Sequence, residues 1–268
     1  MLSLLKESNL LQKLPVTLCA VTLLAASSSA WSTSFTIVDG QFVTSQQTLS
    51  TGETGTINSG GDLTTSATAI TTSSNNVTVL NNGTITTTGN RAYGMYSNAN
   101  SGTSTLTNSG TITTSGFRNY GITLGANTGT ATITNSGTIT TSGSKGYGIV
   151  VTNIGTVTAT NSGTITTTGD DASGIVVINF GIGTFTNSGT ITSSGASSSG
   201  IYSDGSRGTS TFNNSGTITT SGSNGYGIYS KSNSGTSTIT NSGTITTSGG
   251  YGIYSNLNSG TSTITNSG

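Results

Sequence analysis

The chain has 268 residues, of which only 5% are charged, and seven basic and seven acidic side chains give a formal net charge of zero. With so little positive charge, we expect no nucleic-acid partner, because nucleic-acid binding depends on neutralising phosphates. The sequence has no histidine and one cysteine, which excludes the usual catalytic triads and cysteine-based zinc sites. We therefore expect neither a cofactor nor a metal.

The first segment, residues 1–30, has the pattern of a secretory signal peptide. Lys6 and Lys13 form a basic region, residues 14–26 are apolar, and small residues follow as a cleavage site. The apolar stretch is too short to span a bilayer comfortably. The single cysteine, Cys19, lies in this segment, so the mature chain has no thiol or disulfide. A buried helix is the alternative, which the abrupt change in composition after this segment disfavours.

The remainder of the chain is repetitive, which decides the architecture. An Asn-Ser-Gly tripeptide, Asn-Asn-Gly in one copy, recurs every 25–27 residues. Residues 58–268 are therefore expected to form a repeat domain, with residues 31–57 as lead-in strands that cap its amino-terminal end.

Each repeat contains three short runs of strand-forming residues, separated by Gly, Ser and Asn. Examples are TITT at 111–114, YGIY at 226–229 and STIT at 237–240. Each run offers one main apolar side chain, so a single repeat cannot close a core, but stacking repeats ~4.8 Å apart buries three apolar columns. The sequence predicts an all-β fold, a right-handed parallel β-helix with three short strands per coil and about eight to nine coils. A helical solenoid is disfavoured by poor helix propensity, and a propeller by the short repeat.

The asparagine of each tripeptide is expected at a turn between the third run and the first. Asparagine tolerates left-handed backbone, and its amide can bond the asparagine one coil above. We predict a structural ladder of Asn81, Asn108, Asn135, Asn161, Asn187, Asn214 and Asn241. A sugar-binding row is the alternative, disfavoured because turn chemistry already explains these residues.

The repeated NSGTITTSG and YGIY motifs behind a long signal peptide resemble the passenger domains of Gram-negative autotransporters, including filamentous-haemagglutinin-like and pertactin-like adhesins. The resemblance covers residues 58–268 well and residues 31–57 loosely. It implies export through an outer-membrane β-barrel translocator, and display at the outer membrane, on the cell surface or outside the cell. The implied partner is a surface protein or glycan of a host or neighbouring cell. The sequence ends at Gly268 without barrel strands, so we expect a fragment of a longer chain or a passenger served by a separate translocator.

Tyrosines flank the glycine of the second run. One row is expected to point outward and to bind a partner through its rings: Tyr96, Tyr202, Tyr229 and Tyr254. The other row is expected to face the core and pack in a corner: Tyr93, Tyr120, Tyr147, Tyr226 and Tyr251. Val150 and Val176 replace the outward tyrosine in the middle coils. With Ile178, Phe180 and Ile182, they are expected either to form an apolar contact patch or to be buried by a bulge.

The first run of each repeat reads Thr-Ile-Thr, so an inward isoleucine leaves two outward threonines. Stacking predicts a flat array with spacings of ~6.8 Å and ~4.8 Å, which resembles the faces of ice-binding solenoids. The candidate ice-binding residues are Thr111, Thr113, Thr138, Thr140, Thr164, Thr166, Thr217, Thr219, Thr244 and Thr246. The alternative is that threonine is simply a soluble strand former.

The charged residues do not suggest an enzyme. Acidic side chains occur singly in different repeats, apart from the adjacent Asp170 and Asp171, which we interpret as a polar turn. Arg91, Arg118 and Lys145 lie at matching positions in successive repeats and are expected to form a solubilising basic stripe. We expect a structural and adhesive surface rod, with an ice-binding protein as the alternative and a polysaccharide-active enzyme as a third hypothesis.

Overall fold

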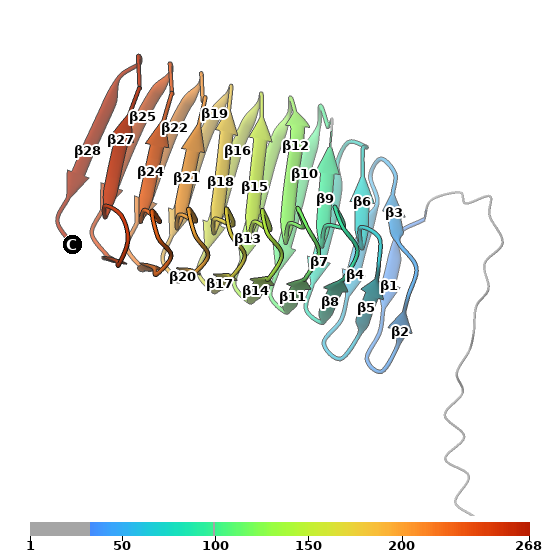
Figure 1. Ribbon diagram of the computed structural model, residues 1–268. Coiled ribbons are helices and arrows are strands. Elements are labelled where there is room, and N and C mark those ends of the chain that lie inside the picture. Colours follow the sequence, from blue (N-terminus) through green and yellow to red (C-terminus); the bar gives the residue numbers. More distant parts are fainter. Residues whose placement is uncertain (1–32, 99) are drawn as a thin grey trace, which may run out of the picture. The chain divides into compact units, whose positions relative to one another are not determined.

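The protein is represented by a computed structural model that describes residues 33–98 and 100–268. The expected signal peptide lies outside these ranges. The described residues form 28 strands, which are arranged in three parallel sheets (Figure 1).

Each sheet receives one strand from every turn of the chain. Sheet A contains β1 (Phe35–Ile37), β4 (Thr54–Ile57), β7 (Val77–Asn81), β10 (Thr103–Asn108), β13 (Thr130–Asn135), β16 (Thr156–Asn161), β19 (Ile182–Asn187), β22 (Thr209–Asn214), β25 (Thr236–Asn241) and β28 (Ser262–Asn266). Sheet B contains β2 (Phe42–Val43), β5 (Asp62–Thr65), β8 (Thr84–Thr87), β11 (Thr111–Thr114), β14 (Thr138–Thr141), β17 (Thr164–Thr167), β20 (Thr190–Ser193), β23 (Thr217–Thr220) and β26 (Thr244–Thr247). Sheet C contains β3 (Gln47–Leu49), β6 (Ile70–Thr72), β9 (Met95–Asn98), β12 (Ile122–Asn127), β15 (Ile149–Asn153), β18 (Ile175–Asn179), β21 (Ile201–Asp204), β24 (Ile228–Lys231) and β27 (Ile253–Asn256).

The chain visits sheets A, B and C in turn, and every strand pairs in parallel with the strand one coil away. The predicted all-β parallel solenoid with three strands per coil is confirmed. Residues 35–49 already supply β1, β2 and β3, which pair with β4, β5 and β6. The segment expected to provide lead-in strands therefore contributes a complete coil of the solenoid.

The core consists of apolar columns that run along the solenoid. In sheet B, Ile85, Ile112 and Ile139 stack in direct register and are fully buried. Burying one such side chain contributes roughly 1.5–3 kcal/mol. In sheet A the column changes size locally, because the small Ala159 pairs with Phe185, whose ring stacks on Phe212 with centroids 5.2 Å apart. The repeated isoleucines therefore produce one continuous core that no single coil could form.

The corner between sheets A and B carries the asparagine ladder. Each side-chain amide from Asn81 to Asn241 donates to the amide oxygen of the asparagine one coil further on, at 2.6–2.7 Å. Most of these asparagines are fully buried, so the bonds satisfy groups that water cannot reach. The ladder is thus a structural feature of the corner.

The corner between sheets B and C determines which way the side chains just before each sheet C strand point. Arg118 and Lys145 occupy the same turn position in successive coils, with left-handed φ values of 55° and 56°. In both of these coils a tyrosine and a buried glycine follow, directly before the sheet C strand. A Cβ on Gly94 would lie 2.5 Å from the carbonyl oxygen of Gly121 and 2.7 Å from Cγ2 of Ile112. This position therefore has no room for a side chain.

Candidate functional site

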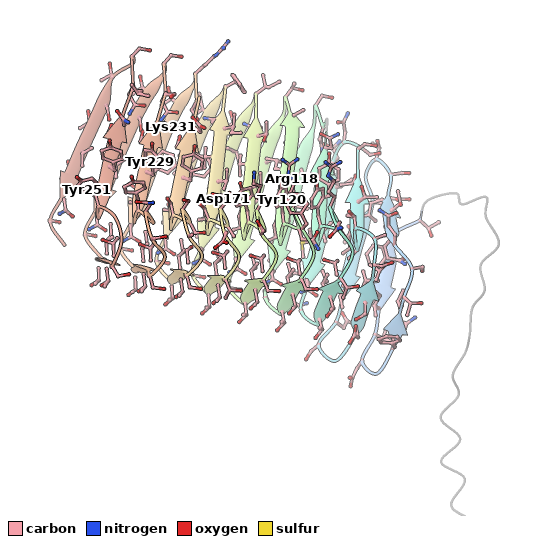
Figure 2. All side chains as sticks on the ribbon, in the orientation of Figure 1. Arg118, Tyr120, Asp171, Tyr229, Lys231 and Tyr251 are labelled. Carbon is pink, nitrogen blue, oxygen red and sulfur yellow. The ribbon has the colours of Figure 1, made fainter. Side chains whose placement is uncertain are left out.

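All nine tyrosines of the chain lie on the outer face of sheet C or at its edge. The outer row, Tyr96, Tyr202, Tyr229 and Tyr254, projects from strands β9, β21, β24 and β27. The corner row, Tyr93, Tyr120, Tyr147, Tyr226 and Tyr251, stands at the B–C corner, two residues before each strand begins. Figure 2 shows three of these tyrosines, Tyr120, Tyr229 and Tyr251, on the same face.

The rings of the two rows contact each other, so both rows lie on the outside. Tyr93 meets Tyr96 with ring centroids 5.3 Å apart, and Tyr226 meets Tyr229 at 4.7 Å. The prediction that the corner row faces the core is therefore wrong. The physical reason is the intervening glycine, such as Gly94, because it points inward together with the residue that follows it and breaks the period-two alternation at the corner.

The tyrosines form two clusters. The first cluster contains Tyr93, Tyr96, Tyr120 and Tyr147, and three of its rings, Tyr93, Tyr120 and Tyr147, stack along the solenoid with centroids 4.8 and 5.2 Å apart. The second cluster contains Tyr202, Tyr226, Tyr229, Tyr251 and Tyr254, whose contacting rings have centroids 4.7–6.2 Å apart. Aromatic pairs of this kind contribute about 0.5–1.5 kcal/mol beyond their buried area, so each cluster stiffens the face that it covers.

Two hollows lie between and beside the clusters. One has a volume of about 430 Å³ and is lined by Lys145, Tyr147, Asp171, Ser173, Ser197, Ser199, Tyr202, Asn224, Tyr226 and Tyr229. The other has about 420 Å³ and is lined by residues of the first cluster together with Val150, Val176, Tyr202 and Asp204. Tyr147 and Tyr202 line both hollows. The tyrosine face is therefore uneven, with hollows bordered by tyrosine rings.

The two valines of the middle coils belong to the second of these hollows. Val150 and Val176 are only 7% and 5% exposed, although their neighbours in the strand face the core. Strands β15 and β18 pair in regular register, and the register shift between β12 and β15 lies beyond the pair of Thr123 with Val150. The two valines therefore do not contribute to an exposed apolar patch, whereas Phe180 and Ile182, which were expected in the same patch, are exposed.

A charged column runs beside the corner row. Arg91, Arg118 and Lys145 occupy the left-handed turn position in three successive coils, and Asp171 occupies it in the next. Their backbone N–H groups donate to carbonyl oxygens of the following coil at 2.8–3.0 Å, so the stack continues through the turns. Figure 2 shows Arg118 and Asp171 on the tyrosine face. The sign of the charge thus changes where the first hollow begins.

Burial raises the pKa of the Tyr120, Tyr147 and Tyr202 hydroxyls, which favours their neutral form. Burial, followed by the neighbouring Tyr93, raises the pKa of Tyr120, and the nearby arginines oppose this shift. Burial, followed by Tyr120 and Asp171, raises the pKa of Tyr147 to about 12. Burial raises the pKa of Tyr202, and so does its hydrogen bond to Oδ2 of Asp204 at 2.7 Å. At neutral pH these groups therefore act as hydrogen-bond donors.

The candidate ice-binding threonines lie on the outer face of sheet B. Their strands β11, β14, β17, β23 and β26 belong to one sheet in which each threonine pairs with a threonine of the next coil. Each isoleucine between two threonines points inward, and the threonines are exposed or half-buried. The structure thus contains a regular threonine array over this face.

A second asparagine corner, between sheets C and A, was not foreseen. Asn100, Asn127, Asn153 and Asn179 are fully buried there, and the carbonyl of each accepts from backbone N–H groups one coil further on. The signal was present in the sequence, because each of these residues begins an Asn-x-Gly motif like that of the first corner. These residues therefore also form turns and connect one coil to the next.

Asp170 and Asp171 lie in a turn. Oδ1 of Asp170 accepts from the backbone N–H of Ala196 at 2.9 Å. Within residues 33–98 and 100–268, no group of three His, Cys, Asp or Glu residues could hold a metal ion. In the same ranges, no helix has the length and apolar character needed to cross a membrane.

Residues 22–189 match the model of a family described as the BigA third pectate lyase-like domain. The match covers more than half of the chain. The chain belongs to this family. No curated protein and no solved structure matches it. In this pectate lyase-like domain, the matched range extends through β19 and includes the charged column and the first tyrosine cluster. All residues of the second cluster lie beyond residue 189.

Proposed function

We propose that this pectate lyase-like domain is an exported, surface-displayed rod that adheres to a neighbouring or host cell through the tyrosine face of sheet C. The observation that carries the proposal is the segregation of all nine tyrosines onto one of three faces. Sheet B, in contrast, presents threonines at the corresponding outward positions. Such a one-sided distribution favours a contact surface over a general need for solubility.

Tyrosine suits this role because its ring supplies a large rigid contact area and its hydroxyl supplies a hydrogen bond. Aromatic residues are enriched at protein binding surfaces, where a few of them contribute most of the binding free energy. Here the rings are held by parallel strands whose spacing is uniform from coil to coil. The face would therefore meet its partner with little loss of conformational entropy.

The route to the cell surface is part of the proposal. Its support is the signal-peptide pattern of residues 1–30 and the resemblance to autotransporter passengers, which are exported through an outer-membrane β-barrel. In this proposal the domain binds and does not catalyse. The acidic residues Asp170 and Asp171 then act in a turn, in agreement with the hydrogen bond from Ala196 to Asp170.

Adhesion tests the proposal directly. The purified secreted protein is incubated with cultured host cells and with bacteria, and bound protein is measured by flow cytometry. Replacing the outer row by serine (Tyr96, Tyr202, Tyr229 and Tyr254→Ser) is expected to lower binding at least tenfold, which corresponds to about 1.4 kcal/mol. A matched control replaces four threonines of sheet B by serine (Thr113, Thr140, Thr166 and Thr219→Ser) and is expected to bind normally. Equal binding by both variants would contradict the proposal.

A second candidate function is ice binding, favoured by the in-register threonine array of sheet B. Its test is inhibition of ice recrystallisation by the secreted protein. In that case Thr140→Tyr, at the centre of the array, would abolish the effect and the outer-row serine variant would retain it. An inactive wild-type protein would eliminate this candidate.

A further inference from the structure

The corner row of tyrosines is interrupted at two successive coils. Gly148, Gly174 and Gly200 donate their N–H groups to the carbonyl oxygens of Ser173, Ser199 and Tyr226. The repetition of this bond shows that the two serines occupy the position that Tyr147 and Tyr226 hold in the flanking coils. At these two positions the row therefore has a serine in place of a tyrosine ring.

The interruption leaves an open space between two aromatic surfaces. Tyr147 and Tyr226 are three coils apart, roughly 14 Å at the usual strand spacing. Tyr147 stacks on Tyr120 on one side, and Tyr226 stacks on Tyr251 and Tyr254 on the other. Within the described residues, no ring covers the faces of Tyr147 and Tyr226 that point toward the gap. The hollow of about 430 Å³ between them lies in the range of small-ligand sites.

The polar groups of this hollow include both donors and acceptors. Lys145 and Asp171 bring one positive and one negative charge, and Ser199 and Asn224 add neutral groups. In the described part of the chain, the side chains of Lys145, Asp171 and Asn224 form no hydrogen bond or ion pair. A ligand with many hydroxyl groups would satisfy these donors and acceptors. The opposite charges of Lys145 and Asp171 sum to zero, so the hollow has no net charge that would favour an ionic ligand.

Tyr202 forms one side of the hollow, and its ring is held in place by two contacts. Its hydroxyl donates to Oδ2 of Asp204 at 2.7 Å, and its ring lies 5.3 Å from that of Tyr229. Ser173 and Ser199 are each 3% exposed and bring the backbone close to the hollow. The site therefore has aromatic faces at both ends, a fixed ring at one side and short polar side chains beneath.

We propose that this gap, which we call the tyrosine notch (Tyr147, Ser173, Ser199, Tyr202 and Tyr226), binds a short neutral oligosaccharide. The apolar faces of its sugar rings stack on Tyr147 and Tyr226, and its hydroxyls bond to Lys145, Asp171 and Asn224. The inference rests on the proposed adhesive function and names the ligand class of that face. The sugar rings would complete the stack that the two serines interrupt.

The test uses the full secreted protein and an array of neutral and anionic oligosaccharides of defined length, followed by calorimetry with each hit. Neutral oligosaccharides are expected to bind. Ser173→Tyr fills the notch and should weaken binding at least tenfold. Its matched control is Thr68→Tyr in the same column at the other end of the first cluster. Both substitutions remove a hydroxyl that accepts a backbone N–H, from Ser199 in one case and from Tyr93 in the other.

A second pair of variants guards against a folding defect. Tyr147→Ala removes a ring at the notch, and Tyr93→Ala removes a ring at the far end of the same stack. Only Tyr147→Ala is expected to lose oligosaccharide binding, with circular dichroism unchanged in both. Binding of anionic oligosaccharides alone, or no binding at all, would overturn the inference, and so would full binding by Ser173→Tyr.

The cell-adhesion assay separates this inference from the proposed function. If Ser173→Tyr adheres to cells as well as the wild-type protein does, the notch is not the contact site and the adhesive function stands. If the wild-type protein binds oligosaccharides but no cells, the adhesive function fails and the notch stands.

Discussion

At the scale of single residues, Tyr147 shows how the stack changes the chemistry of a side chain. Its ring lies against Tyr120, and its hydroxyl is near Asp171. Both the burial and these neighbours disfavour the phenolate, so the neutral form persists well above the ordinary pKa of about 10. The tyrosine face therefore keeps its hydrogen-bond donors over the whole physiological pH range.

This shift predicts how stability depends on alkaline pH. The pKa of Tyr147 is raised to about 12, so the folded state binds more protons than the unfolded state between pH values of about 10 and 12. Stability is then unaffected below about pH 9 and falls as the pH rises through that window. Absorbance at 295 nm should show late-titrating phenolates that are absent in urea, and Tyr147→Phe should remove one of them while Tyr202 still titrates late. Identical titration curves for the folded and the urea-unfolded protein would contradict the assignment.

At the scale of strands and corners, a glycine decides where the corner tyrosines point. Gly148 precedes β15, and a Cβ there would collide with Cγ2 of Ile165 in sheet B and lie 2.5 Å from the carbonyl oxygen of Gly174. A residue with a side chain could not pack this closely against Ile165 of sheet B, so the backbone can take this path into β15 only with a glycine at position 148. The preceding residue, Tyr147, is consequently turned to the outside.

Gly148→Ala should therefore destabilise the protein by about 1–3 kcal/mol, as overpacking commonly does. The expected measurement is a lower midpoint of urea unfolding. Gly252→Ala is a matched control, because Gly252 holds the same position before β27 and a Cβ there meets only Cγ2 of Ile245, at 3.8 Å. If both variants unfold at the same urea concentration, the packing argument fails.

At the scale of the whole domain, each coil contacts its neighbours and the core is a stack of similar layers. Stability in such an array is close to a sum of coil and interface terms, so a local defect has local consequences. The ladders of asparagine and isoleucine run through successive coils from Asn81 onward. The rod should therefore open in segments under stress.

Ile165→Ala tests this behaviour at a fully buried site of β17. The substitution should cost about 2–5 kcal/mol through lost burial and a residual cavity. Hydrogen exchange should accelerate in β14, β17 and β20, which stack directly on one another, and remain slow in β5 and β8. Uniform acceleration along the whole domain would contradict segmental opening.

Much of this architecture could be predicted from the repeat. The spacing of Asn161 from its counterparts places identical residues one coil apart, which predicts the asparagine ladder, and the three strand-forming runs of each repeat predict the three sheets. The second asparagine corner, at Asn153, had the same signal and was overlooked. The tyrosine face could be predicted only in part, since Tyr202 points outward by strand alternation but Tyr147 does not follow that rule.

The repeat pattern is enough to give the length of a coil and the residues that stack, because repeated strand-forming runs with one apolar side chain each can bury that side chain only in register. The tertiary structure alone decided that Tyr147 and Tyr226 face outward and that Ser173 and Ser199 open a hollow between them. The reason is that these features depend on contacts across a corner, such as that of Gly148 with Ile165, between residues that no local periodicity connects.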